Sequence, residues 1–420
     1  MLFGVGDVLG AGIYGLIGKA AGEMGNAVWL GFLVSMLAAG LTGLSYASLG
    51  SRFPRAGGAS YITLRAYRSP FLAYVVGFAV LASGVTSMAT AARVFAGYLG
   101  AMIPVLPPLL IALGFSLFLA GLVFRGMKAA LIANGFCTLI ELGGLLLVIV
   151  VGIPYLGSVD YLDATTLANP SGDISIMLLL SGAVLTFYSF IGFEDMLNVA
   201  EEVKDPQRTL PRALLLALVL ASLVYLTIAL VAVSVLSPIA LADSQQPLVD
   251  VVGAAAPWFP LAAFSLIALF AVANTALLNY IMASRLLYGM ACQRLVPRVL
   301  SKIHAGYRTP HVAILAVWVV FVMLIVSGDI ATLARATSAL LLSCFTVVNI
   351  ALVIVKRQDS GKGEHFDVPA IIPVLGAGVC IAMLSQARWP ELLTAGLVLA
   401  GIAGLYFVVR PSAEAIETME

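Results

Sequence analysis

Three carboxylates stand inside apolar stretches of the sequence, and their chemistry needs an explanation. Asp7 lies in GDVLGAGIYGLIGK, Glu141 in ANGFCTLIELGG and Glu194 in FYSFIGFEDM. If these stretches cross a bilayer, each charged carboxylate costs at least about 2.5–3.5 kcal/mol near the centre. A carboxyl group avoids that cost by taking up a proton or by pairing with a cation. The three acids are therefore candidates for proton coupling or gating.

Each of these acids has two interpretations. Glu141 falls in the middle of its apolar stretch, so we expect it to accept a proton; alternatively, it stays protonated and hydrogen-bonds a neighbouring helix. Asp7 either shares that proton or binds a cation, or it lies near the end of its span in contact with water. Glu194 acts in a gate or contacts a cationic substrate. Arg93, the most deeply placed basic residue, either pairs with a carboxylate or reaches outward from its span.

The stretch that contains Asp7 also holds five glycines. Glycine in a helix interior costs about 0.5–1 kcal/mol relative to alanine, so this helix is most easily interrupted within GAGIYG. A second weak point lies in LTFYSFIGFEDMLNVAEE, where Ser189, Gly192 and Glu194 interrupt an aromatic run. Isolated glycines in membrane helices usually mark close helix packing. Here the two clusters lie about 180 residues apart, and each adjoins an acid, which favours two interrupted helices.

Interrupted helices have a specific chemistry. A half-helix that begins inside a membrane has free N–H groups, which suit an anionic group. A half-helix that ends there has free carbonyls, which suit a cation or an ammonium. The two together suit a zwitterion, and interruptions at corresponding positions of two halves are typical of inverted-repeat secondary transporters.

The elements that position these residues are predicted from composition. The 420 residues are 61% hydrophobic and only 10% charged, which is too few charged groups to cover a soluble domain. The sequence therefore predicts an all-α integral membrane protein. Runs long enough to cross about 30 Å of hydrocarbon predict twelve spans, near 2–22, 27–50, 71–99, 106–124, 129–155, 174–200, 210–236, 258–290, 310–327, 331–355, 368–386 and 391–409.

The basic residues predict the orientation of these spans. If the N-terminus is cytoplasmic, 18 of the 22 Lys and Arg residues lie in or beside the inner connections. We therefore expect a multi-pass protein of the cell membrane with both termini in the cytoplasm. Because the first span begins directly at Met1, a short N-terminal tail is expected to precede it. No connection is long enough for a soluble domain.

Other classes of protein find no support in the sequence. The three histidines lie far apart, and no Ser-His-Asp, metal-ligating or phosphate-binding constellation is present. We therefore expect neither an enzyme nor a bound cofactor or metal, and no nucleic-acid partner.

Several segments resemble those of a known family. GDVLGAGIYGLIG resembles the glycine-rich first helix of the amino acid–polyamine–organocation (APC) superfamily, and FYSFIGFEDMLNVAEEVKDPQRTLPRAL is similar to its helix 6 and the loop that follows. FPRAGGASY and ASRLLYGMACQRLVPRVLSKIHAGYRTP resemble two of its cytoplasmic loops. The resemblance covers the whole chain and implies a LeuT-type fold in a single membrane domain. Two inverted repeats of five helices would occupy 1–157 and 173–356, followed by two further helices in 366–410.

The resemblance also implies roles for individual residues. The backbone of one interrupted stretch would receive the carboxylate of a substrate: Gly10, Ala11, Gly12 and Ile13. Carbonyls near Phe187, Ser189 and Phe190 would receive its ammonium group. Phe190, Ile191 and Gly192 would border the side-chain pocket or form part of a gate. Some proton-coupled relatives have a lysine at the spacing where this chain has Glu141.

These observations predict a secondary transporter that moves amino acids across the membrane by alternating access, as a proton-coupled symporter. Its partners would be an amino acid or related amine, the proton and the lipid bilayer. An amino acid or amine exchanger and a polyamine transporter are alternatives within the same class. An amino acid sensor that does not transport is the alternative from a different class.

Overall fold

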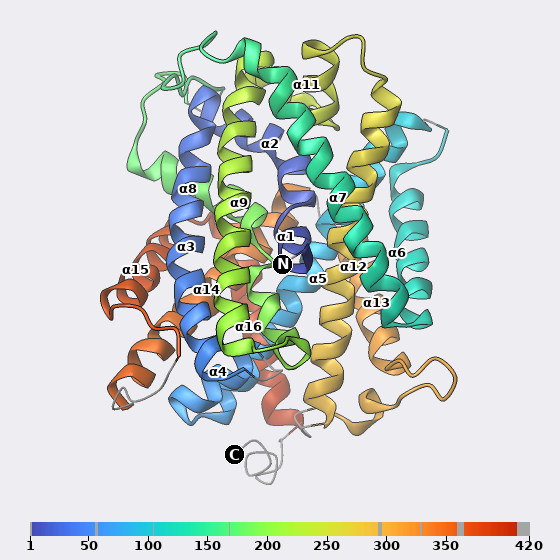
Figure 1. Ribbon diagram of the computed structural model, residues 1–420, viewed down its shortest axis with the longest axis vertical. Coiled ribbons are helices and arrows are strands. Elements are labelled where there is room, and N and C mark those ends of the chain that lie inside the picture. The colour runs from blue at the N-terminus through green and yellow to red at the C-terminus, as the bar shows by residue number, and fades with distance from the viewer. Residues whose placement is uncertain are drawn as a thin grey trace.

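The computed structural model describes residues 2–54, 58–103, 105–167, 169–292, 296–327, 330–358 and 365–409. Within these ranges the chain forms helices and no strands, and the long helices run close to the longest axis of the molecule (Figure 1). The first half contains α1 (Leu2–Val8), α2 (Ala11–Met24), η1 (Gly25–Ala27), α3 (Val28–Arg52), α4 (Gly58–Tyr67), α5 (Pro70–Met102), α6 (Pro108–Arg125), α7 (Met127–Gly152) and η2 (Ile153–Tyr155).

The second half begins with a helix in three pieces, α8 (Ile176–Thr186), η3 (Phe187–Phe190) and η4 (Phe193–Glu202). The remaining helices are α9 (Pro206–Val235), α10 (Pro238–Asp243), α11 (Pro247–Ala255), α12 (Leu261–Cys292), η5 (Arg298–Ser301), α13 (His311–Ser327), α14 (Ile330–Gln358), α15 (Ile371–Ser385) and α16 (Trp389–Val409).

Eight stretches of the described chain are long and apolar enough to cross a membrane, and the first of them, Gly4–Arg52, contains two of the predicted spans. The other seven coincide with seven further predictions. Shorter apolar helices at His311–Ser327, Ile371–Ser385 and Ala395–Gly404 lie where the remaining three spans, 310–327, 368–386 and 391–409, were expected. The chain is therefore an all-helical integral membrane protein.

The interrupted helices occupy the middle of the bundle. Figure 1 shows α1 about halfway between its two ends, enclosed by longer helices. Among these, α3 packs along α9, and α5 packs along both α12 and α14. Peripheral helices expose apolar side chains to the surroundings, for example Phe118 on α6 (65% exposed) and Val150 on α7 (63%). A lipid-facing surface explains such exposure without cost.

Ion pairs join helices at the two ends of the bundle. At one end, Glu23 of α2 pairs with Arg335 of α14, and Arg388 lies 3.0 Å from the same carboxylate. At the other end, Asp367 pairs with Arg52 at the end of α3 (3.1 Å) and with Lys356 of α14 (2.6 Å).

Candidate functional site

The first membrane helix is interrupted at Gly10. α1 ends at Val8 and α2 begins at Ala11. Gly10 between them has φ 145° and ψ −137°, a backbone conformation that residues other than glycine avoid. Two side chains bind the freed backbone groups: the Tyr225 hydroxyl donates to the Val8 carbonyl (2.6 Å), and Thr275 Oγ1 accepts the Ala11 N–H (3.2 Å). The predicted interruption within GAGIYG is confirmed.

The second interruption is at Gly192. α8 ends at Thr186, and η3 makes one tight turn. The backbone then takes a positive φ of 123° at Gly192. This interruption was also predicted, but the continuation differs from an ordinary helix. The ten residues of η4 form a 3₁₀-helix, which is unusually long for that conformation.

The two interruptions touch each other. A Cβ atom added to Gly12 would collide with the Cα atom of Ser189, and one added to Gly192 would collide with the main-chain oxygen of Asp7. The structure thus brings together all the residues predicted to bind substrate, and all are buried: Gly10, Ala11, Gly12, Ile13, Phe187, Ser189, Phe190, Ile191 and Gly192. The two stretches are therefore in direct contact at Gly12 and at Gly192.

Glu141 lies beside the first interruption. Its side chain is fully buried on α7, and neither carboxylate oxygen has a hydrogen-bond partner among the described residues. A Cβ atom on Gly10 would stand 3.3 Å from Glu141 Oε1, and the Tyr14 hydroxyl donates to the main-chain oxygen of Glu141 (3.2 Å). A carboxyl group in such surroundings is stable when it carries a proton.

Asp7 lies beside the second interruption and is only 2% exposed. The interpretation that water hydrates Asp7 near the end of its span is therefore wrong, because neighbouring helices cover the middle of the bundle where α1 lies (Figure 1). Neither of its carboxylate oxygens has a partner among the described residues. A Cβ atom on Gly192 would stand 3.2 Å from Asp7 Cγ, so the acid packs directly on the turn.

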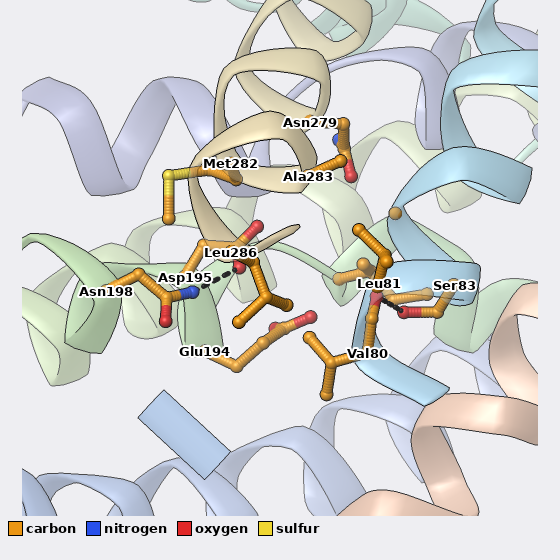
Figure 2. Close-up of a pocket in the computed structure, with 12 residues that line it drawn as sticks. Val80, Leu81, Ser83, Glu194, Asp195, Asn198, Asn279, Met282, Ala283 and Leu286 are labelled. Carbon is orange, nitrogen blue, oxygen red and sulfur yellow. Dashed lines mark hydrogen bonds between the residues drawn. The ribbon is translucent and has the colours of Figure 1, made fainter. Parts of the chain in front are cut away.

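Glu194 and Asp195 follow the turn and are also buried. Glu194 Oε2 accepts the Gly192 N–H (3.0 Å), which fixes the turn, and Asp195 Oδ1 accepts a hydrogen bond from the Asn198 amide (3.1 Å). Figure 2 shows both acids beside a small cavity between η4, α5 and α12, opposite Val80 and Met282. The cavity measures about 10 Å³, room for about one water molecule.

Sequence reasoning passed over three contributors to this site. Asp195 was indicated only by its place directly after Glu194, and Tyr225 only as the one aromatic residue within an apolar run. Tyr46, which is fully buried, lines a second cavity of about 10 Å³ with Glu194. Arg93 is partly buried on α5 and takes part in none of the ion pairs that join described residues.

Comparison with known proteins agrees with the geometry. The family model described as "Amino acid permease" matches residues 1–398, and the chain belongs to this family. The branched-chain amino acid permease BcaP of Bacillus subtilis is 24% identical over 413 residues, which cover 92% of this chain and 86% of that protein.

Two further relatives differ in the substrates that their names state. The methylthioribose transporter of B. subtilis is 24% identical over 90% of this chain and 85% of its own length. The vacuolar cationic amino acid transporter 2 of Arabidopsis thaliana is 30% identical over 84% of this chain and 58% of its own length. The chain is therefore similar to permeases and transporters of the APC superfamily.

Proposed function

We propose that this protein transports amino acids by alternating access, with the substrate bound between the two interrupted stretches. The N–H groups of Gly12 and Ile13, in the first turn of α2, have no acceptor within that helix and suit a carboxylate. Carbonyls near Phe187, Ser189 and Phe190 receive the ammonium group, and Ile191 borders the side-chain pocket. The observation that carries this proposal is the direct contact between the two interruptions in a chain of the amino acid permease family.

That contact supports alternating access. Gly12 and Ser189 leave no space between the stretches, whereas a zwitterion must reach both. One half of each interrupted helix therefore moves away from the other during the cycle, and the glycine turns absorb the change in backbone angles.

We also propose that transport is coupled to protons through Glu141, with Asp7 and Glu194 in supporting positions. Glu141 is the acid beside Gly10, so its protonation state acts on the stretch that holds the substrate carboxylate. A proton there removes the repulsion between two negative groups in a buried site.

The test is uptake of labelled amino acids into proteoliposomes with and without an imposed pH gradient. We expect the gradient to accelerate uptake, and Glu141→Gln to abolish the acceleration. Asp243→Asn, at the exposed last residue of α10, is the matched control and should behave as the wild type. Uptake that ignores the gradient, or that keeps its gradient dependence in Glu141→Gln, would show that protons are not coupled here.

A cationic amino acid or a polyamine is a second candidate substrate. Asp7, Glu194 and Asp195 surround Gly192 without a basic partner among the described residues, and a second positive charge on the substrate would compensate them. Competition of lysine and putrescine against leucine in the same assay separates the candidates. Counterflow without net uptake would instead identify an exchanger, and ligand binding without transport a sensor.

For the membrane topology we propose twelve crossings, with inverted repeats in 1–157 and 173–356, two further helices in 366–410, and both termini in the cytoplasm. Cysteine labelling in intact cells tests this arrangement. We expect Asp160→Cys to react with an impermeant thiol reagent from outside, and Lys302→Cys to react only after permeabilisation. The opposite pattern would reverse the orientation.

A further inference from the structure

One amide side chain connects three helices beside Glu141. Asn274 lies on α12 and is 1% exposed. Its amide nitrogen lies 3.4 Å from the Gly6 carbonyl of α1 and 3.4 Å from Thr138 Oγ1 of α7. Both distances are long for a hydrogen bond from an amide N–H, so the amide group is held only weakly. Asn274 therefore joins α1, α7 and α12 through contacts that it can exchange for others.

The face of α7 that Asn274 contacts is polar. Asn134, Thr138 and Glu141 are spaced by four and then three residues, so they share one face of the helix, and all three are buried. Phe136, on the opposite face, is exposed. α1 packs directly on the polar face, because a Cβ atom on Gly6 would collide with Thr138 Oγ1. The end of α1 thus lies against a row of groups that can form hydrogen bonds.

Three buried oxygen atoms in this region have no hydrogen-bond partner among the described residues. They are the two carboxylate oxygens of Glu141 and Oδ1 of Asn274. The Asn274 side chain lies beside the Glu141 carboxyl. The Gly6 carbonyl can only accept, so the amide turns its NH₂ group towards α1 and leaves Oδ1 without a donor. A single proton on Glu141 provides the donor that these oxygens lack.

We propose that Asn274 is a positioning residue that connects the proton on Glu141 to the position of α1. This inference rests on the proposed proton coupling. While Glu141 is protonated, its O–H donates to Asn274 Oδ1, and the amide N–H groups stay on Gly6 and Thr138. When Glu141 loses the proton, its carboxylate repels Oδ1 and attracts the amide N–H, because a hydrogen bond to a charged acceptor is stronger than one to a carbonyl. The amide then turns away from Gly6.

The loss of this donor matters because Gly6 lies in the last turn of α1. Carbonyls there have no N–H partner within the helix, and Asn274 supplies the donor for Gly6 from outside it. A buried carbonyl without a donor is unfavourable, so deprotonation favours an arrangement in which α1 moves and water reaches Gly6. The charge of Glu141 thereby acts on the first interrupted helix.

Glu141 is the group here that changes its charge. The titratable side chains around it are Cys137 of α7, Tyr14 of α2 and Tyr225 of α9, and thiols and phenols are uncharged at neutral pH. Asp7 of α1 lies beside the other interruption. The described parts of α6, α11 and α12, which also pack against α7, add no charged group beside Glu141. The charge that turns the amide is therefore that of Glu141 itself.

The first experiment measures uptake into proteoliposomes at a series of external pH values with the internal pH fixed. Asn274→Leu keeps the shape of asparagine and removes its donors. Uptake should then be half-maximal at an external pH about one unit higher, because the ionised Glu141 has lost a hydrogen bond. Asn274→Gln, which keeps an amide, should follow the wild type. Asn349→Leu, which removes a buried amide that bonds Thr42 on other helices, should lose stability and keep the wild-type pH profile.

A second measurement follows α1 without transport. Val5→Cys on α1 is buried, and its rate of reaction with a thiol reagent at one fixed pH, read at residue 5 by peptide mass spectrometry, reports how often α1 moves away. Asn274→Leu should accelerate the reaction, and Glu141→Gln, which cannot become charged, should slow it.

The outcomes separate this inference from the proposed proton coupling. Uptake that ignores the pH gradient in the wild type would contradict the coupling, and the labelling of residue 5 would still decide whether Asn274 holds α1. An unchanged pH profile in Asn274→Leu, an equal shift in Asn349→Leu, or a labelling rate that Asn274→Leu does not alter would overturn the role of Asn274.

Discussion

The acids at the ends of the bundle and the acids at its centre differ in the groups that surround them. At the ends, Glu23 pairs with Arg335, and Asp367 pairs with Arg52. At the centre, the carboxylate oxygens of Asp7 and Glu141 have no hydrogen-bond partner among the described residues. The paired acids join helices through ion pairs, whereas the central acids need a proton or an incoming cation.

The paired acids at the ends are therefore expected to contribute to stability, and the central acids to function. A buried pair that loses one partner destabilises a protein, because the remaining charge is uncompensated. A central acid that carries a proton can be replaced by its amide with little loss of stability. The central acids also lie beside the two glycine turns, which move in the alternating-access cycle that we propose.

The largest effect is expected at the centre, from Gly192→Ala. The methyl group would collide with the backbone of Asp7, and the residue would keep a positive φ. We expect a loss of roughly 4 kcal/mol of stability, from about 1–3 kcal/mol of backbone strain and about 1–3 kcal/mol of overpacking, together with loss of transport. Thermal unfolding in detergent and uptake in proteoliposomes measure both.

Gly114→Ala is the control for this change, because a Cβ atom there would meet nothing within 4 Å. It should unfold at the wild-type temperature or slightly above. If Gly192→Ala is as stable and as active as Gly114→Ala, then the second turn does not require glycine.

An intermediate effect is expected from Glu23→Gln, compared directly with Glu141→Gln. Glu23→Gln should cost about 2 kcal/mol, less than the usual 3–5 kcal/mol for a buried pair, because Glu23 is 24% exposed and Arg335 also donates to the Ser181 carbonyl. Glu141→Gln should unfold at the wild-type temperature, because glutamine has the shape of protonated glutamate. Equal destabilisation by the two variants would show that the acids at the ends and the acids at the centre do not differ in their contribution to stability.

The smallest effect is expected from Asp367→Asn. Partial burial opposes ionisation of Asp367, but hydrogen bonds from Lys356, from the Val368 N–H and from Arg52 outweigh it and lower the pKa to about 2. The stabilisation is therefore fully present above the unfolded pKa of about 4. It is lost as the pH falls towards 2.

Unfolding temperatures measured between pH 2 and pH 5 test this prediction. The wild type should lose stability with falling pH more steeply than Asp367→Asn. Because the Asp367 side chain is 44% exposed, the difference should be small and should shrink in high salt. Parallel pH profiles of the two proteins would mean that the pair contributes nothing to stability.

Local composition explains why the two helix interruptions were predictable. The interruption at Gly10 follows from glycines crowded into one apolar run, and the one at Gly192 from a glycine between aromatic residues and acids. The burial of Asp7 was not predictable, because its exposure depends on helices far away in the chain. Tyr225, which binds the freed Val8 carbonyl, is likewise an ordinary polar residue until α9 packs against α1.

By itself, the sequence determined that this is a helical membrane protein, where its helices lie, and which two of them break, because hydrophobicity and helix propensity are local properties. Only the tertiary structure decided that the two breaks touch and that Glu141 and Asp7 lie beside different breaks. Those facts depend on contacts between residues more than a hundred positions apart, and such contacts follow from packing.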